Sequence, residues 1–171
     1  MDIVDFRDLW VRPALRHLGK GIADERLKMV VSSLAAERLM LGTAVTESGL
    51  RHLRQRTNTG FGPALSFFQI ESATFDDVMR YVRRRAHFHD RLSELVPWVE
   101  PTFQDLAPYP MLAVCVARLK YWMRPEPLPA ASETRALAVV WKVVFNTELG
   151  KGRIQDFIDH MNNVVLPTEK E

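Results

Sequence analysis

A long apolar pattern of helical period runs from Asp24 to Glu47, and it leaves little choice of fold class. Asp24 has the side chain of an N-cap, and Ser48 and Gly49 follow the last residue of the pattern. Because such a helix must bury its apolar face, the pattern predicts the core helix of a mainly helical domain. The apolar side chains recur three or four residues apart, at Leu27, Val30, Val31, Leu34, Ala35, Leu39 and Met40.

Other segments with helical spacing predict further helices over 2–18, 75–85, 111–123, 135–146 and 154–164. The segment 111–123 is apolar nearly all round, so it predicts the most buried helix. Pro13 is expected to kink or split the first of these helices, and Thr74 has the form of an N-cap for the second. Trp141 and Phe145 lie one turn apart and therefore share a helix face.

The chain length predicts one domain with a single core over 1–171. The 171 residues are enough to bury about two-thirds of the unfolded surface without disulfides or metals. We expect an N-terminal helical extension over 1–22, a core over 23–165 and a polar tail over 166–171. The net charge of +2 is too small to predict a nucleic-acid partner, and the lone Cys115 predicts a small core residue.

The sequence carries no signal for export, membrane insertion or metal binding. Asp2 and Asp5 stand where a secretory signal has a basic start and an apolar core, so no signal peptide is predicted. No apolar run approaches the ~18 residues that a membrane span requires, so no span is expected. His87 and His89 lie two residues apart and do not share a helix face, which argues against a metal pair. We therefore expect no metal and no cofactor.

Glu47 is a carboxylate at the C-terminal end of a predicted helix. There the helix macrodipole opposes the charged form, and the apolar segment 62–69 that returns after a basic loop adds desolvation. Both effects raise the pKa of a carboxyl group and favour its protonated form. That is the form that a general acid needs near neutral pH to protonate a leaving group.

Three motifs occur in order along the chain: Glu47-Ser48 at the helix end, SFFQ at 66–69 with SAT at 72–74, and FNT at 145–147 with GKG at 150–152. They resemble the motifs Glu-Ser, Gly-Leu-Met-Gln with Pro-Ala-Thr, and Tyr-Asn-Ala-Gly of the lytic transglycosylases of the goose-type lysozyme superfamily. The resemblance touches roughly residues 24–160. It implies a lysozyme-like α-helical fold with a very small β-hairpin between residues 55 and 70.

A second resemblance concerns the segment GPALSFFQ at 62–69. It is similar to the GPAL-x-x-x-Q segment of virion-associated proteins of tailed bacteriophages. The two resemblances together imply partners of two kinds, peptidoglycan glycan strands and other phage virion or tail proteins. They place the protein in a phage virion or in the host periplasm or cell wall.

The first resemblance implies a peptidoglycan-cleaving lytic transglycosylase that acts with one catalytic carboxylate. Glu47 would protonate the glycosidic oxygen and then, as a carboxylate, take the proton of the muramyl 6-hydroxyl. The implied substrate-binding residues fall into two groups. Ser48 and Gln69 would position substrate or backbone, and the others would surround the sugar cleft, namely Phe67, Phe68, Phe145 and Asn146.

Departures from the motifs leave alternatives open. The glycine, proline and tyrosine of the family are replaced by Ser66, Ser72 and Phe145, and in the family that tyrosine hydroxyl bonds the catalytic carboxyl. These changes favour a non-catalytic phage structural or tail-assembly protein that keeps a lysozyme-like fold. The arginines of the loop 51–60 match carboxylates of lactyl or peptide groups, or form a solvated surface, and they suggest a DNA-binding module only weakly. Glu71 is the nearest candidate for a second catalytic carboxylate.

Overall fold

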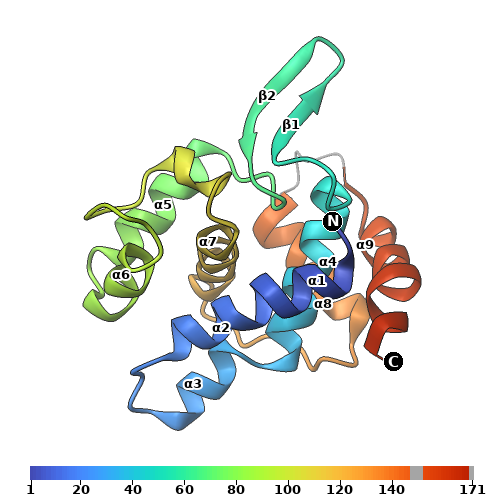
Figure 1. The fold of residues 1–171 in the computed structure, drawn as a ribbon. Coiled ribbons are helices and arrows are strands. Elements are labelled where there is room, and N and C mark those ends of the chain that lie inside the picture. The colour runs from blue at the N-terminus through green and yellow to red at the C-terminus, as the bar shows by residue number, and fades with distance from the viewer. Residues whose placement is uncertain (147–151, 170–171) are drawn as a thin grey trace.

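The computed structural model describes residues 1–146 and 152–169 (Figure 1). Among the described residues, helices hold 63% and strands 7%, and these strands form a small antiparallel sheet. The prediction of a mainly helical fold with a very small hairpin is therefore confirmed. In Figure 1 the helices α4 and α7, bounded below, run through the middle of the molecule, and the hairpin projects beyond the other elements.

The helices and strands follow one another along the chain. The α-helices are α1 Ile3–Phe6, α2 Arg12–Gly19, α3 Glu25–Val31, α4 Leu34–Ser48, α5 Ser72–Val82, α6 Ala86–Ser93, α7 Pro110–Trp122, α8 Thr134–Trp141 and α9 Ile154–His160. Turns of π-helix are η1 Arg7–Val11, η3 Lys142–Asn146 and η4 Met161–Val165, and 3-10 turns are η2 Phe103–Leu106 and η5 Leu166–Glu169. The strands are β1 Arg54–Thr57 and β2 Gly60–Leu65. The helix predicted over 2–18 consists of α1, η1 and α2 without a gap, and the helix predicted over 135–146 consists of α8 and η3. Each of the two therefore contains one turn of π-helix.

The helix predicted from Asp24 to Glu47 is in fact two helices, α3 and α4, which corrects the expectation of a single one. Asp24 caps α3 as predicted, because its Oδ1 accepts hydrogen bonds from the backbone N–H groups two and three residues on. Ser33 starts the second helix with an extended backbone (ψ 158°) and a hydroxyl that accepts from Ala36 N at 3.1 Å. A serine side chain that bonds the backbone competes with the hydrogen bonds of a continuing helix, so Ser33 interrupts the helix here. The apolar spacing in the sequence runs through this break and does not reveal it.

Arg118 of α7 binds the C-terminal end of α3. Its side chain is buried, and its Nε and Nη2 donate to the carbonyl oxygens of Val31 and Val30, each at 3.1 Å. The last carbonyls of a helix have no acceptor role within that helix, so they need such an outside donor. Burial lowers the pKa of Arg118 to about 10, which still leaves the guanidinium charged at neutral pH.

The core forms around α7 and α4. α7 is apolar and buried along most of its length, as its composition predicted, and it packs against α2 and α4. α4 also contacts α8 and α9. The contact with α9 passes over Gly42, where an added Cβ atom would lie 2.4 Å from Phe157 Cζ, so a glycine is required at this point.

The two ends of the described chain join this core. Phe6 and Leu18 of the predicted N-terminal extension are fully buried in it. The described part of the predicted tail forms η5, and Glu169 makes an ion pair with Arg38 of α4. Residues from both ends of the described chain thus pack on the same core as α4 and α7.

α5 begins at Ser72, and its N-cap position is Glu71. The prediction that Thr74 is the N-cap is therefore wrong. Leu65 and Ile70 form a two-way backbone bridge, at 2.9 and 2.8 Å, which closes the turn 66–69, and the backbone of Glu71 is extended just before the helix starts. Thr74 lies instead within the first turn of α5, facing the groove described below.

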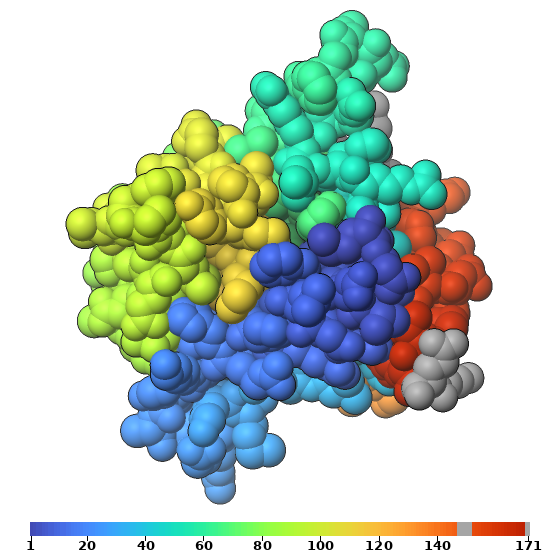
Figure 2. Space-filling view, viewed as in Figure 1, coloured from blue at the N-terminus to red at the C-terminus, as the bar shows by residue number. Residues whose placement is uncertain are grey.

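The strands β1 and β2 form the hairpin that was expected between residues 55 and 70. Arg56 pairs with Phe61 and Thr57 pairs with Gly60, and the register shifts between Arg54 and Arg56. Figure 2 shows the hairpin standing out from the surface of the helical body. Its return strand leads directly to the turn 66–69 beside the end of α4.

By length and mean hydropathy alone, the stretch Glu25–Ser48 could cross a membrane. However, 56% of its most apolar 18-residue segment is buried inside the structure, and the core helix of a soluble protein can have the same length and hydropathy. The stretch also contains the break at Ser33.

Candidate active site

Glu47 lies in the last turn of α4, half-buried, where the helix ends in the left-handed conformation of Gly49 (φ 58°). It faces a groove of about 850 Å³ between the hairpin and the helical body. The walls come from the hairpin, the turn that follows it, α5, α7 and η3. The lining residues are Glu47, Gln55, Arg56, Thr57, Asn58, Thr59, Gln69, Ile70, Glu71, Thr74, Lys120, Phe145 and Asn146.

The carboxyl group of Glu47 is held by donors from α8 and η3. Trp141 Nε1 donates to Glu47 Oε1 at 2.9 Å, and the side chain of Asn146 forms a second hydrogen bond with the carboxyl group. Lys142 Nζ donates to Asn146 Oδ1 at 2.8 Å, so the amide nitrogen of Asn146 is the atom left to face Glu47. One helical segment thereby supplies both donors to the carboxyl group.

Burial raises the pKa of Glu47 above its ordinary value of 4.5. The hydrogen bonds from Trp141 and Asn146 and the charge of Lys142 oppose this rise, and burial has the larger effect. The upward direction agrees with the expectation from the sequence. The carboxyl group is thus biased toward the protonated form and still has donors that stabilise the charged form once the proton has left.

Trp141 is the residue of the site that sequence reasoning missed. Its side chain is fully buried and stacks on Phe157, with ring centroids 5.6 Å apart. Gly152 also packs closely, since an added Cβ atom there would lie 2.6 Å from Trp141 Cη2 and 2.9 Å from Asn146 Nδ2. The only signal in the sequence was that Trp141 shares a helix face with Phe145, which lines the groove and stacks on Tyr121 at 5.4 Å.

Ser48 and Gln69 hold the turn 66–69 against the end of α4. Ser48 Oγ lies 2.8 Å from the carbonyl oxygen of Phe67, to which it donates. Gln69 Nε2 donates to the carbonyl oxygen of Ser66 at 2.7 Å, and Gln69 also lines the groove. Their contacts position the backbone beside Glu47, which is one of the two roles expected for them.

Phe67 and Phe68 do not line the groove, which corrects the place expected for them. Both are buried against Phe6, with ring centroids 5.4 and 6.1 Å away. Ser66 and Gln69 at the two ends of this turn adopt left-handed backbone conformations, with φ of 67° and 50°. The turn therefore directs the aromatic pair into the core and leaves Gln69 at the groove.

Three further expectations concern the third motif, a metal site and Glu71. Thr147, Gly150 and Lys151 of the third motif lie outside the described residues. Within residues 1–146 and 152–169, no group of His, Cys, Asp and Glu side chains is arranged to hold a metal ion. Glu71 lines the same groove as Glu47 and is exposed.

Comparisons with protein-family models, with curated proteins and with solved structures find no match to this chain.

The raised pKa of Glu47 predicts a pH-dependent difference in stability between the wild type and Glu47→Gln. A carboxyl group whose pKa is higher in the folded state stabilises the fold below its unfolded value, here 4.5, and loses this contribution as the pH rises through the folded value. Denaturant unfolding across this range should show the wild type losing free energy of unfolding relative to Glu47→Gln as the pH rises above 4.5. A difference that stays constant or grows in favour of the wild type would contradict the buried acid.

Proposed function

We propose that this protein cleaves the glycan strands of peptidoglycan as a lytic transglycosylase, with Glu47 as the catalytic acid and base. The observation that carries the proposal is a half-buried carboxyl group with a raised pKa, facing an open groove. The groove volume of about 850 Å³ lies within the range of ligand sites in proteins. The ordered motifs around Glu47 supply the substrate class.

The contact with Trp141 influences which oxygen of Glu47 carries the transferable proton. An indole N–H donates and cannot accept, so Glu47 Oε1 must act as an acceptor in both protonation states. The carbonyl oxygen of a neutral carboxyl group is a better acceptor than its hydroxyl oxygen, so this contact favours the proton on Oε2.

The proposed reaction needs one carboxyl group. Glu47 gives its proton to the glycosidic oxygen as the bond to C1 of the muramyl residue breaks, and the leaving sugar departs as an alcohol. The resulting carboxylate then takes the proton of the muramyl 6-hydroxyl while the 6-oxygen bonds to C1. The products are an anhydro-sugar and a neutral Glu47, so no water is consumed. Trp141 and Asn146 stabilise the carboxylate between the two steps.

The indole of Trp141 also bears on the missing tyrosine hydroxyl at Phe145. In the family that this sequence resembles, the hydroxyl bonds the catalytic carboxyl. Here Trp141, one turn earlier on the same helical segment, donates to Glu47 at 2.9 Å. This donor supports the proposal of an enzyme, because the catalytic carboxyl group still receives a hydrogen bond although a different residue supplies it.

A non-catalytic virion or tail-assembly protein is the second candidate. The observation that favours it is the burial of Phe67 and Phe68 against Phe6, because the second motif then contributes to the core and not to sugar binding. The serines at positions 66 and 72 point the same way. In either case the proposed setting is a phage virion or the host periplasm or cell wall.

Digestion of purified peptidoglycan, followed by mass analysis of the soluble fragments, tests the proposal. Release of fragments that end in an anhydro-sugar is the expected result. Fragments with reducing ends would show that the protein is a hydrolase and not a transglycosylase. A complete lack of released fragments, with protein that is folded by circular dichroism, would favour the non-catalytic candidate.

A further inference from the structure

The hairpin that forms one wall of the groove carries arginines and no acidic residue. Between Glu47 and Glu71 the chain contains no aspartate or glutamate, and it contains Arg51, Arg54 and Arg56. The remainder of the chain mixes both signs of charge, so this segment differs from the usual surface. A wall of one sign attracts ligands of the opposite sign into the groove.

Two of these arginines share one aromatic support. The guanidinium carbons of Arg54 and Arg56 lie 5.0 and 4.8 Å from the ring centroid of Phe61, which is itself 58% exposed. The shift in register between Arg54 and Arg56 accompanies this arrangement. Stacking on a ring uses the flat face of a guanidinium and leaves its N–H edge for a ligand.

These arginines also lack the carboxylate partners that other arginines have. Arg12, Arg83 and Arg153 each form an ion pair with an acidic side chain. Among the residues that the structure describes, no acidic side chain pairs with Arg54 or Arg56. No side chain within 1–146 or 152–169 therefore uses their N–H edges.

Arg56 brings this charge to the catalytic carboxyl group. It lines the large groove together with Glu47, and it lines a smaller adjoining pocket of about 280 Å³ with Glu47, Ser48 and His52. A ligand in contact with Glu47 thus lies within the same two cavities as Arg56. An anionic group close to the reacting bond would meet Arg56, and Arg54 lies beside it on the same Phe61 ring, outside the lining of both cavities.

We propose that Arg54 and Arg56, supported by Phe61, bind a carboxylate of the glycan strand, from a lactyl group or a stem peptide, and so select an acidic substrate. The planar fork of a guanidinium matches the two oxygens of a carboxylate. The inference rests on the proposed glycan substrate, but it concerns binding and not cleavage. It assigns the hairpin the role of reading charge beside the catalytic acid.

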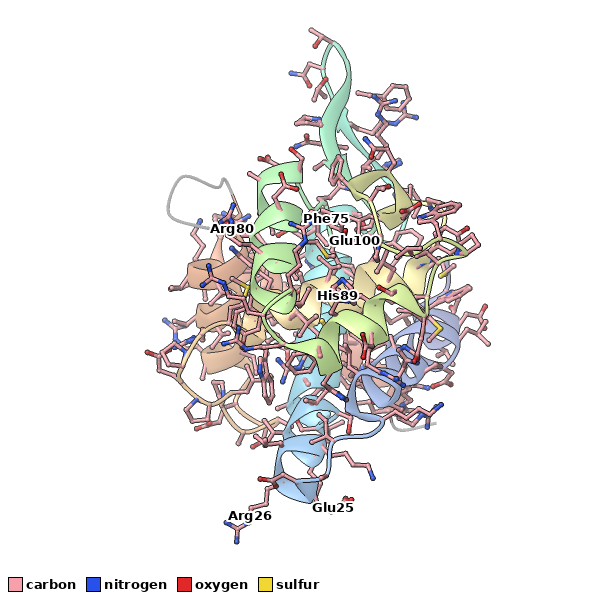
Figure 3. All side chains as sticks on the ribbon, turned by 90° about the vertical axis from the view of Figure 1, so that its left-hand side faces the viewer. Glu25, Arg26, Phe75, Arg80, His89 and Glu100 are labelled. Carbon is pink, nitrogen blue, oxygen red and sulfur yellow. The ribbon has the colours of Figure 1, made fainter. Side chains whose placement is uncertain are left out.

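Pelleting with insoluble peptidoglycan sacculi measures this binding without cleavage when all proteins carry Glu47→Gln. The test variant adds Arg54→Gln and Arg56→Gln. The matched control adds Arg26→Gln and Arg84→Gln, which removes the same charge from exposed positions outside the groove. Figure 3 shows Arg26 on α3, at the opposite end of the molecule from the hairpin. All variants are first checked for unchanged thermal unfolding.

The test variant is expected to bind native sacculi about tenfold more weakly than the Glu47→Gln background, since each exposed contact contributes modestly. The control should bind as the background does. Sacculi whose carboxylates have been converted to methylamides should abolish the difference between the test variant and the background. The affinity of the background should also fall with added salt, because the contacts are exposed.

Three results would overturn the proposal: equal binding by the test variant and the background, an equal loss in the control, or a difference that persists on amidated sacculi. Tighter arginine-dependent binding to duplex DNA than to sacculi would also overturn it. Failure of the catalytic proposal is distinguishable from these results. If the protein releases no fragments but its binding still depends on the arginines and on the carboxylates, the catalytic proposal fails and the proposed binding site on the hairpin stands.

Discussion

Replacing Glu47 by glutamine is expected to lower the rate of glycan cleavage by at least the ~10²- to 10⁴-fold that a general acid or base contributes. Glutamine keeps the length of the side chain and an oxygen that can accept from Trp141 Nε1, but it has no proton to transfer. The free energy of unfolding near neutral pH should stay the same or rise, because the amide avoids the cost of a buried ionisable group. Release of soluble fragments from peptidoglycan, measured beside urea unfolding, gives both quantities from one variant.

Glu71→Gln is the matched comparison, because Glu71 is a second carboxylate in the same groove. A single-carboxylate mechanism predicts that this change costs much less activity than Glu47→Gln. An equal loss in both variants would point to a two-carboxylate glycosidase. Retained cleavage in Glu47→Gln together with a clear loss of stability would show that Glu47 is structural.

Replacing Trp141 by alanine is expected to lower the free energy of unfolding by about 3–5 kcal/mol, the usual cost of deleting a large aromatic side chain from a core. Trp141 is fully buried between α4 and α9 and stacks on Phe157, so the change leaves a cavity. Urea unfolding measures the loss. Val139→Ala on the same helix is the control, because Val139 is 43% exposed and its truncation should change stability by less than about 0.5 kcal/mol. Equal stabilities in the two variants would show that Trp141 does not stabilise the core.

Trp141→Phe separates the role of the N–H group from that of the ring. The hydrogen bond from Trp141 lowers the pKa of Glu47, so its loss should raise that pKa further. The alkaline limit of the pH profile of kcat/KM, which reports the essential acid, should therefore move to higher pH. A profile that loses height without moving would indicate that Trp141 only supports the fold.

Sequence periodicity predicted most of the helical core, because apolar spacing is a local property of the chain. It placed α4 and α7 in order, whereas the hairpin was expected only from the family resemblance. It joined α3 to α4, since one serine hydroxyl at position 33 decides the break and the apolar period gives no sign of it. It missed α6, whose buried apolar residues are only Phe88 and Leu92 among charged neighbours.

The candidate site was predictable in part for the same reason. The place of Glu47 at a helix end is a local property of the chain, and the rise of its pKa comes from burial, which the apolar segment 62–69 indicated. Its partner Trp141 lies 94 residues away in sequence, so only tertiary packing reveals the contact. The inward direction of Phe67 and Phe68 depends on the left-handed backbone of Ser66 and Gln69, and non-glycine residues give no sequence signal for that conformation.

Because α3 ends before α4 begins, we expect α3 to open locally once the contacts of Arg118 with its C-terminal carbonyl groups break. It has seven residues, fewer than the ~12–15 that an isolated helix needs in water, and its Leu27, Met29 and Val30 are exposed. Its amide hydrogens should exchange with solvent through local opening, whereas those of the buried part of α4 exchange only when the domain unfolds. The break at Ser33 is thus expected to keep local opening of α3 from spreading into the helix that carries Glu47 at its other end.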